Sequence, residues 1–440
     1  MRYNKNAMGK HKKGKSKKSK HFSDKDILGC DFSDYLAVMP GTMMCLMLFI
    51  MLILDIFMPG MPEEQFTVFP GIFTVLDYMI IACGIIHICL TARRKELRFE
   101  KTDMFFATFA LLILVSTLVN GFNFMTIDGV PYRFIGIFNM LSFMLIYMGV
   151  TRSIKTENPG EYILTGYLIV SNLIGTAVLC DLTTGCIGAF HGKKELSAVF
   201  FNGNHYGYYL LMAILIGLAY FLFGSGRTAI IGAASAALNM LLLVINHSLG
   251  SILALIIVLF CTGLFILIKD RACLRKFSVL TAVVLAAFAV ALIISPALRK
   301  EFTGLAADLA AIFSNTAEGS VGHRRFQMWT LTTGYIAEKP LLGYGCEGIA
   351  FMLYEAMKVS DPHCEILAYA AYYGIPAAIM YTAGVIGVIV TCIGRTDTNG
   401  VQQKAACMAA GGYFLSSLVG VGMFYTLPFF FIFLGLSVKH

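Results

Sequence analysis

Long apolar segments separated by short polar segments make up most of the chain. Apolar runs recur from residue 35 to the C-terminus, and a helix of about 20 such residues spans a bilayer. The weaker alternating pattern of a membrane-spanning barrel is absent. The predicted fold class is therefore all-α: a polytopic transmembrane helical bundle. We expect twelve spans, at about 35–58, 70–91, 103–121, 133–150, 161–180, 206–223, 228–246, 249–268, 277–295, 374–394, 401–424 and 427–438.

The positive charges predict the orientation of this bundle. Residues 1–34 form a basic tail, and its first 21 residues carry nine Lys/Arg and no acid. The short loops at 91–101, 151–157, 224–228, 269–276 and 394–404 are also basic, whereas the alternate short loops carry few positive residues. Because cytoplasmic loops are enriched in Lys and Arg, we expect both termini in the cytoplasm and residues 35–440 to form one domain in the cytoplasmic membrane. We expect the tail to bind anionic lipid, not nucleic acid.

Two outer loops are longer than the rest, at about 181–205 and 296–373. Long loops between membrane helices are usually functional, so we expect the active site there. Part of the second loop, "RRFQMWTLTTGYIAEK", has helical periodicity and is expected to form an interfacial helix.

Residues 322–348, "GHRRFQMWTLTTGYIAEKPLLGYGCEG", provide candidate phosphate ligands. Arg325 and Trp329 are four apart and share a helix face. The guanidinium forks of Arg324 and Arg325 suit a phosphate or diphosphate. Pro340 is expected to end the helix before a glycine turn. The alternative is an amphipathic helix at the membrane surface, with arginine reaching water and Trp329 at the headgroups.

Residues 358–367, "KVSDPHCEIL", provide a candidate general base. Asp361 is the expected N-cap of the following helix, with Pro362 as its first residue. His363 is suited to accept a proton, and Glu365 either orients it or acts in its place. The alternative is a capped helix start with a bystander histidine.

These stretches together resemble the O-antigen ligase and O-antigen polymerase family of bacterial membrane proteins. The resemblance covers about 200–380 and rests on the Arg325–Trp329 spacing, "PLLGYG" at 340–345, and the distance from His363 to "GIP" at 374–376. A weaker match is "FFNGNHYGYYL" at 200–210. Two departures are Cys364, where the family has Asn, and Ala377, where it has Gly.

The resemblance implies a metal-independent glycosyl transfer from a polyprenyl-diphosphate-linked glycan to a glycan, lipid or cell-wall acceptor at the outer membrane face. His363 and Arg325 are then the catalytic candidates. The candidate substrate-binding residues are Arg324, Trp329, Glu365, Asn202, Asn204, His205, Lys193 and Lys194. A polar turn before a helix is the alternative interpretation of Asn202, Asn204 and His205. The family pattern leaves polymerase and ligase both open, with a slight preference for polymerase.

A membrane transporter or flippase is the main alternative function. Ionisable residues within spans mark transport pathways, and Asp77 and His87 are the clearest examples here. No nucleotide-binding loop, cofactor motif or Cys/His metal spacing is present, so no cofactor is expected. Disulfides between Cys180 and Cys186 or between Cys346 and Cys364 remain open.

Overall fold

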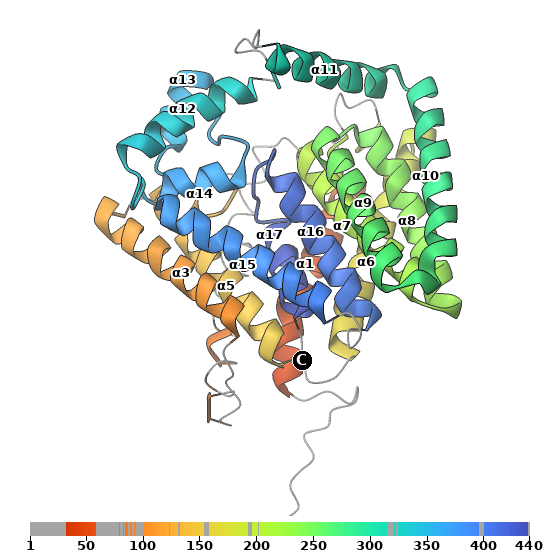
Figure 1. Cartoon of the computed structure of the whole chain (residues 1–440), viewed down its shortest axis with the longest axis horizontal. Helices are drawn as coiled ribbons and strands as arrows, with labels where there is room; N and C mark the ends of the chain where they lie inside the picture. The colour runs from red at the N-terminus through yellow and green to blue at the C-terminus, as the bar shows by residue number, and fades with distance from the viewer. Residues whose placement is uncertain are drawn as a thin grey trace, which may run out of the picture.

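The structure is a computed structural model of the chain (Figure 1). It describes residues 32–58, scattered positions between 79 and 93, and 100–122, 124–130, 133–153, 158–191, 196–200, 202–314, 321–322, 324–395 and 400–438. Most of the basic tail and most of the predicted 70–91 span, including Asp77 and His87, lie outside these residues.

The described part of the chain is helical and contains no strand. The α-helices are α1 (Phe32–Phe57), α3 (Lys101–Asn120), α4 (Phe124–Asp128), α5 (Ile137–Ser153), α6 (Asn158–Thr184), α7 (Gly203–Phe223), α8 (Gly226–Asn246), α9 (Leu249–Lys269), α10 (Leu274–Ile294), α11 (Pro296–Phe313), α12 (Arg325–Glu338), α13 (Ala350–Met357), α14 (Glu365–Tyr373), α15 (Ile375–Gly394), α16 (Val401–Ser417) and α17 (Leu427–Ser437). Two short 3₁₀ helices are η2 (Ala198–Phe200) and η3 (Arg271–Cys273).

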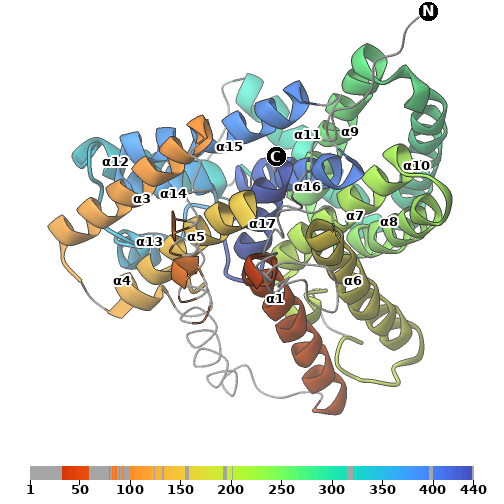
Figure 2. The same ribbon diagram turned by 90° about the horizontal axis from the view of Figure 1, so that it is seen from below.

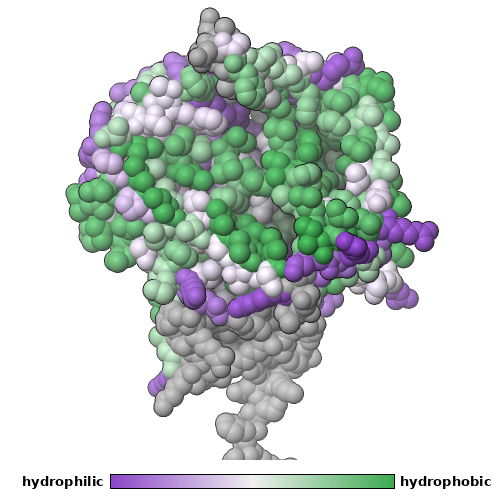
Figure 3. Space-filling view, in the orientation of Figure 1, coloured by the Kyte–Doolittle hydropathy of each residue, from purple (hydrophilic) through white to green (hydrophobic). Residues whose placement is uncertain are grey.

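Eight helices within the described residues are long and apolar enough to cross a membrane. They are α1, α3, α6, α7, α8, α9, α10 and α15, and each coincides with a predicted span. The shorter apolar helices α5 and α17 coincide with two more. Hydrophobic residues form a broad band across the middle of the molecule, with hydrophilic residues gathered above and below it (Figure 3). The chain is therefore an integral membrane protein with a helical fold.

The C-terminal part departs from the predicted spans. The 401–424 segment is helical only to Ser417, and residues 418–426 continue as non-helical chain that is buried from Gly420 onward. A Cβ atom added at Gly420 would overlap the hydroxyl of Tyr208, so a side chain there would require the neighbouring atoms to shift. Irregular backbone at membrane depth is tolerated where protein surrounds it, which explains why the helix can end here.

The last helix, α17, is central to the bundle. All of its residues are buried, and it packs against α1, α5, α15 and α16 (Figure 2). The helix is short because its partners, not lipid, cover its surface.

One end of the bundle, the upper end in Figure 1, carries the long-loop helices. Here α11 reaches across from α10 toward α12, α13 and α14. The predicted helix at 324–339 is confirmed as α12. It ends at Glu338 before Pro340, and Gly343 and Gly345 have positive φ values of 60° and 83°. This arrangement places the residues of the second long loop over the ends of α3, α5, α7 and α15.

Candidate active site

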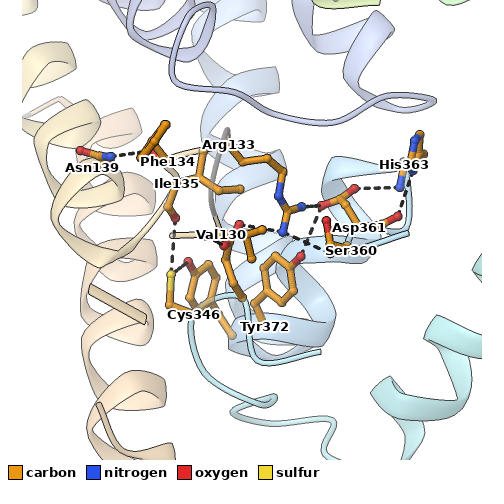
Figure 4. Close-up of polar contacts among 12 residues, drawn as sticks. Val130, Arg133, Phe134, Ile135, Asn139, Cys346, Ser360, Asp361, His363 and Tyr372 are labelled. Carbon is orange, nitrogen blue, oxygen red and sulfur yellow. Dashed lines mark hydrogen bonds and ion pairs between the residues drawn. The ribbon is translucent and has the colours of Figure 1, made fainter. Parts of the chain in front are cut away.

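His363 lies in the short loop between α13 and α14, in a left-handed conformation with a φ of 54°. Its backbone N–H donates to Oδ1 of Asp361 at 2.8 Å, and its ring Nδ1 lies 2.9 Å from the carbonyl oxygen of Asp361 (Figure 4). A carbonyl oxygen can only accept, so Nδ1 carries the proton. The other ring nitrogen, Nε2, then keeps its lone pair and is the atom that can act as a base.

The expected helix cap at Asp361 is wrong. Helix α14 begins at Glu365, and its N-cap is Cys364, with extended backbone and no side-chain hydrogen bond. The left-handed conformation of His363 keeps the chain out of the helix for two residues beyond Pro362. The carboxylate of Asp361 therefore satisfies the N–H of His363 instead of capping α14.

Arg133 is the buried centre of the polar network beneath this loop (Figure 4). Its Nη1 pairs with Oδ2 of Asp361 at 2.5 Å, and its Nη2 pairs with Oε1 of Glu347 at 2.8 Å. Nη2 also donates to the carbonyl oxygen of Ser360 at 3.1 Å. The Tyr372 hydroxyl donates to Asp361 at 3.3 Å, so α14 joins the same network.

One cation here faces two buried carboxyl groups, which favours a proton on one of them. Burial raises the pKa of Glu347 above its ordinary value, against the opposing effect of Arg133. Glu347 also accepts a hydrogen bond from the backbone N–H of Val130, and its own φ is 53°. Arg133 therefore pairs with two buried acids, of which Asp361 also contacts His363.

Helix α12 brings Arg325 and Trp329 to the His363 loop. Nε1 of Trp329 donates to the carbonyl oxygen of Pro362 at 2.9 Å, next to His363 in the chain. Arg325 is one turn earlier on the helix. Its Nη1 donates to the carbonyl oxygen of Gly322 at 3.3 Å, while its buried Nε has no hydrogen-bond partner among the described residues. A guanidinium has five N–H donors, so Arg325 retains donors for an anionic ligand.

The first turn of α7 faces this loop from the other side. His205 is buried, its Nδ1 has no hydrogen-bond partner within the described chain, and it lies in electrostatic range of His363 and Arg133. Three residues on, Tyr208 lies in electrostatic range of Arg325, Glu365 and Asp361. The structure thus places the start of α7 near the His363 loop.

The two asparagines of that turn have structural contacts. Oδ1 of Asn202 accepts the backbone N–H of Asn204 at 2.8 Å and caps α7. The side chain of Asn204 lies 3.5 Å from the hydroxyl of Ser248, at the start of α9. These contacts favour the alternative interpretation of the pair as a polar turn before a helix.

Glu365 is buried, and its side-chain hydrogen bonds within the described chain go to partners other than the ring of His363. Its carboxylate accepts the hydroxyls of Tyr369 at 2.8 Å and Tyr381 at 3.0 Å, and Ser417 also bonds to it. Burial raises the pKa of Glu365 above its ordinary value. Asp361, not Glu365, makes the contacts that orient His363.

The remaining candidates lie apart from His363 or outside the described residues. Arg324 is exposed at the N-cap of α12, with a φ of 68°. Lys193 and Lys194 are outside the described residues. Cys180 and Cys186 are free thiols with sulfur atoms 3.7 Å apart, whereas Cys346 is buried against the Tyr373 hydroxyl and is unpaired, as is Cys364.

Arg133 was missed by sequence reasoning, and one signal was available. It opens the predicted 133–150 span at the end where positive residues are scarce. A lone arginine there contradicts the charge rule for short outer loops, and buried charge in a membrane protein usually has a partner.

No group of three or more His, Cys, Asp and Glu side chains that could hold a metal ion occurs within the described ranges. The side chains near the loop are the imidazole of His363, the guanidinium groups of Arg133 and Arg325, and buried acids. They can accept a proton from a hydroxyl and stabilise an anionic leaving group.

Comparison with known proteins supports the sequence resemblance. Residues 234–382 match the family model described as O-antigen ligase. This range runs from α8 to the first half of α15 and includes Arg324, Arg325, Trp329, His363 and Glu365, but not Arg133 or His205. No curated protein matches the chain.

Proposed function

From the O-antigen ligase domain at residues 234–382, we infer that this membrane protein transfers a glycan from a polyprenyl diphosphate to an acceptor hydroxyl. His363 is the proposed base and Arg325 the proposed leaving-group ligand. The observation that carries the proposal is the fixed tautomer of His363, with Nδ1 held by the carbonyl oxygen of Asp361 and Nε2 free.

The proposed step is a displacement at the anomeric carbon of the lipid-linked glycan. Nε2 of His363 accepts the proton of the acceptor hydroxyl. At the same time, the oxygen of that hydroxyl forms the new glycosidic bond to the anomeric carbon. The bond from the anomeric carbon to the diphosphate breaks, and the diphosphate takes the electron pair. The unpaired donors of Arg325 stabilise the charge that develops on this leaving group.

The other candidates have supporting roles in the proposal. His205 reaches the site from α7, and Trp329 holds the His363 loop against α12. Arg324, Lys193 and Lys194 provide further positive charge for the diphosphate. Glu365, Asn202 and Asn204 shape the walls of the site through the contacts described above.

An apolar groove between α9, α15 and α16 is the proposed site for the lipid chain. It has a volume of about 290 Å³ and is lined mainly by apolar side chains of these helices. Phe414, at its upper end, lies against Tyr381 with ring centroids 6.4 Å apart, and Tyr381 donates to Glu365. The groove therefore extends from Phe414, which reaches Glu365 through Tyr381, to Lys404.

The proposal includes the predicted twelve-span topology, with both termini cytoplasmic and the upper end of Figure 1 outside. The charges agree with this orientation. The lower ends of α9, α10, α15 and α16 carry Lys269, Arg275, Lys276, Arg395 and Lys404.

The test is the distribution of glycan on polyprenyl diphosphate in cells that carry His363→Ala or Arg325→Ala in place of the wild type. Each variant must be present in the membrane. We expect transfer to fall about 10²- to 10⁴-fold without His363 and about 10²- to 10³-fold without Arg325.

The matched controls are His247→Ala and Arg299→Ala. His247 is also in a left-handed conformation at the upper end, with its ring bonded to Ser295, and Arg299 bonds to backbone carbonyls. Single repeat units accumulating on the lipid identify a polymerase, and long lipid-linked chains identify a ligase. An unchanged profile in His363→Ala contradicts the proposal and favours transport.

A further inference from the structure

Arg133 has no part in the proposed chemistry, yet it has the most extensive set of polar contacts near His363. The residue is only 5% exposed, and protein groups occupy both of its terminal nitrogens. Its position does not suit contact with a substrate. Its effect on the reaction must therefore pass through the groups it holds.

Arg133 connects three separate loops at the upper end of the bundle. Its guanidinium binds Glu347 in the loop before α13, and Ser360 and Asp361 in the loop before α14. Its carbonyl oxygen accepts the N–H of Phe424, in the chain between α16 and α17, at 3.1 Å. One residue thus fixes the relative positions of segments far apart in the sequence.

Asp361 links Arg133 to His363. One carboxylate oxygen of Asp361 binds Arg133, while the other accepts the N–H of His363. The carbonyl oxygen of Asp361 holds Nδ1 of the ring. A non-glycine residue with a φ of 54° needs surrounding contacts to hold it, and the two hydrogen bonds of His363 among the described residues both involve Asp361.

We propose that Arg133 is a positioning residue that, by anchoring Asp361, holds His363 in the left-handed conformation that leaves Nε2 free toward the acceptor. This inference rests on the proposed function, because it assumes that His363 is the base. Nothing in the family match supplies it, since Arg133 lies outside residues 234–382.

Three variants test the proposal. Arg133→Lys keeps the charge but not the fork that binds Asp361, Ser360 and Glu347 together. Asp361→Asn removes the anionic partner beside His363. Glu347→Gln is the matched comparison, because Glu347 binds the same guanidinium but bonds to Val130 rather than to His363.

The first measurement is the transfer rate at saturating acceptor, with lipid-linked glycan extracted from cells lacking the protein as donor. For Arg133→Lys and Asp361→Asn we expect rates to fall roughly 10- to 100-fold, as for other residues that orient a functional histidine. KM for the donor should change little. Glu347→Gln should have a distinctly smaller effect than Asp361→Asn.

The second measurement is the fluorescence of Trp329, the sole tryptophan of the chain. Its indole N–H binds the residue before His363, so its emission and quenching by a soluble quencher report the position of this loop. Both should change in Arg133→Lys and Asp361→Asn more than in Glu347→Gln. Thermal unfolding of the detergent-solubilised proteins shows whether each variant is folded.

The activities of the variants distinguish the positioning role of Arg133 from the proposed role of His363 as the base. If His363→Ala is inactive while folded Arg133→Lys and Asp361→Asn are fully active, the positioning role is wrong and the proposed function stands. If all three network variants lose activity only in proportion to their stability, with unchanged Trp329 emission, Arg133 is merely structural. If His363→Ala is fully active, both proposals fail.

Discussion

At the scale of single residues, the site depends on polar groups whose partners are distant in the sequence. Oδ1 and the carbonyl oxygen of Asp361 accept hydrogen bonds from His363, and Oδ2 binds Arg133. One acid therefore orients the proposed base and links it to Arg133. Glu365, two residues beyond His363, belongs to a different cluster of hydroxyl groups. His363 and Glu365, although close in the sequence, thus have different partners.

Replacing Glu365 should reveal a pH-dependent contribution to stability. Because its pKa in the folded protein is raised, the folded state retains a proton that the unfolded chain has lost, and stability falls as pH rises above the ordinary value of 4.5. The glutamine in Glu365→Gln stays neutral at every pH, so this variant does not have the fall in stability that deprotonation of Glu365 causes. We expect its thermal stability relative to the wild type to increase between about pH 5 and about pH 8.

Glu365→Ala is the companion variant. It leaves the hydroxyls of Tyr369 and Tyr381 without their acceptor, so it should destabilise the protein by about 1–3 kcal/mol near pH 5, where wild-type Glu365 keeps its proton. The difference from the wild type should narrow as pH rises. Thermal unfolding in detergent measures both variants. A stability difference between Glu365→Gln and wild type that does not vary with pH would contradict a raised pKa.

At the scale of elements, the bundle combines regular helices with a buried irregular segment. Helices α16 and α17 are joined by residues 418–426, which contact α7, α14 and Arg133. Gly422 illustrates the packing: a Cβ there would lie 2.9 Å from a carboxylate oxygen of Glu365. This segment packs directly against the site from within the protein.

Gly420→Ala tests the packing of that segment. The added methyl would overlap the Tyr208 hydroxyl, so either the segment or α7 must move. We expect a loss of about 1–3 kcal/mol in stability, typical of overpacked interiors, together with reduced transfer.

The matched control is Gly166→Ala, within α6, where no atom lies within 4 Å of the added carbon. An alanine in a helix is favoured over glycine, so this variant should be neutral or slightly more stable. Thermal unfolding of the two variants side by side is the measurement. Equal stability of both would show that residues 418–426 adapt freely.

At the scale of the whole molecule, the site and the apolar groove are stacked. The groove between α9, α15 and α16 is lined mainly by apolar side chains, and its Phe414 end lies next to the Glu365 cluster of hydroxyl groups. Tyr381 joins the groove to this cluster, with its ring against Phe414 and its hydroxyl donating to Glu365. A lipid-linked diphosphate is divided in the same way, with a charged diphosphate that suits the polar site and a long apolar chain that suits the groove.

Filling the groove should therefore reduce use of the donor without disturbing the site. At Gly411, in the groove wall, an added Cβ would have its nearest neighbour 3.9 Å away, so Gly411→Leu places bulk into open space. We expect KM for the lipid-linked donor to rise by about tenfold, the equivalent of about 1.4 kcal/mol of lost binding.

Val390→Phe is the control, because Val390 is exposed on α15 and is not part of the groove wall. Transfer kinetics over a range of donor concentrations compare the two. If both variants have wild-type KM, the lipid chain binds elsewhere on the bundle.

Local patterns determined the helical class, most of the span positions and the end of α12 before Pro340. These follow from apolar run length, glycine and proline positions, and short spacings, all of which act within one or two turns of chain. The local pattern at 361–363 predicted a helix start, so the position of His363 in a loop came from the structure. Only the tertiary structure showed that Arg133 holds Asp361, that Glu365 faces away into a tyrosine cluster, and that α17 is central. The physical reason is that a buried charge or a short helix is stabilised by partners from other segments, here more than 200 residues away for Arg133 and Asp361, and local sequence patterns do not identify those partners.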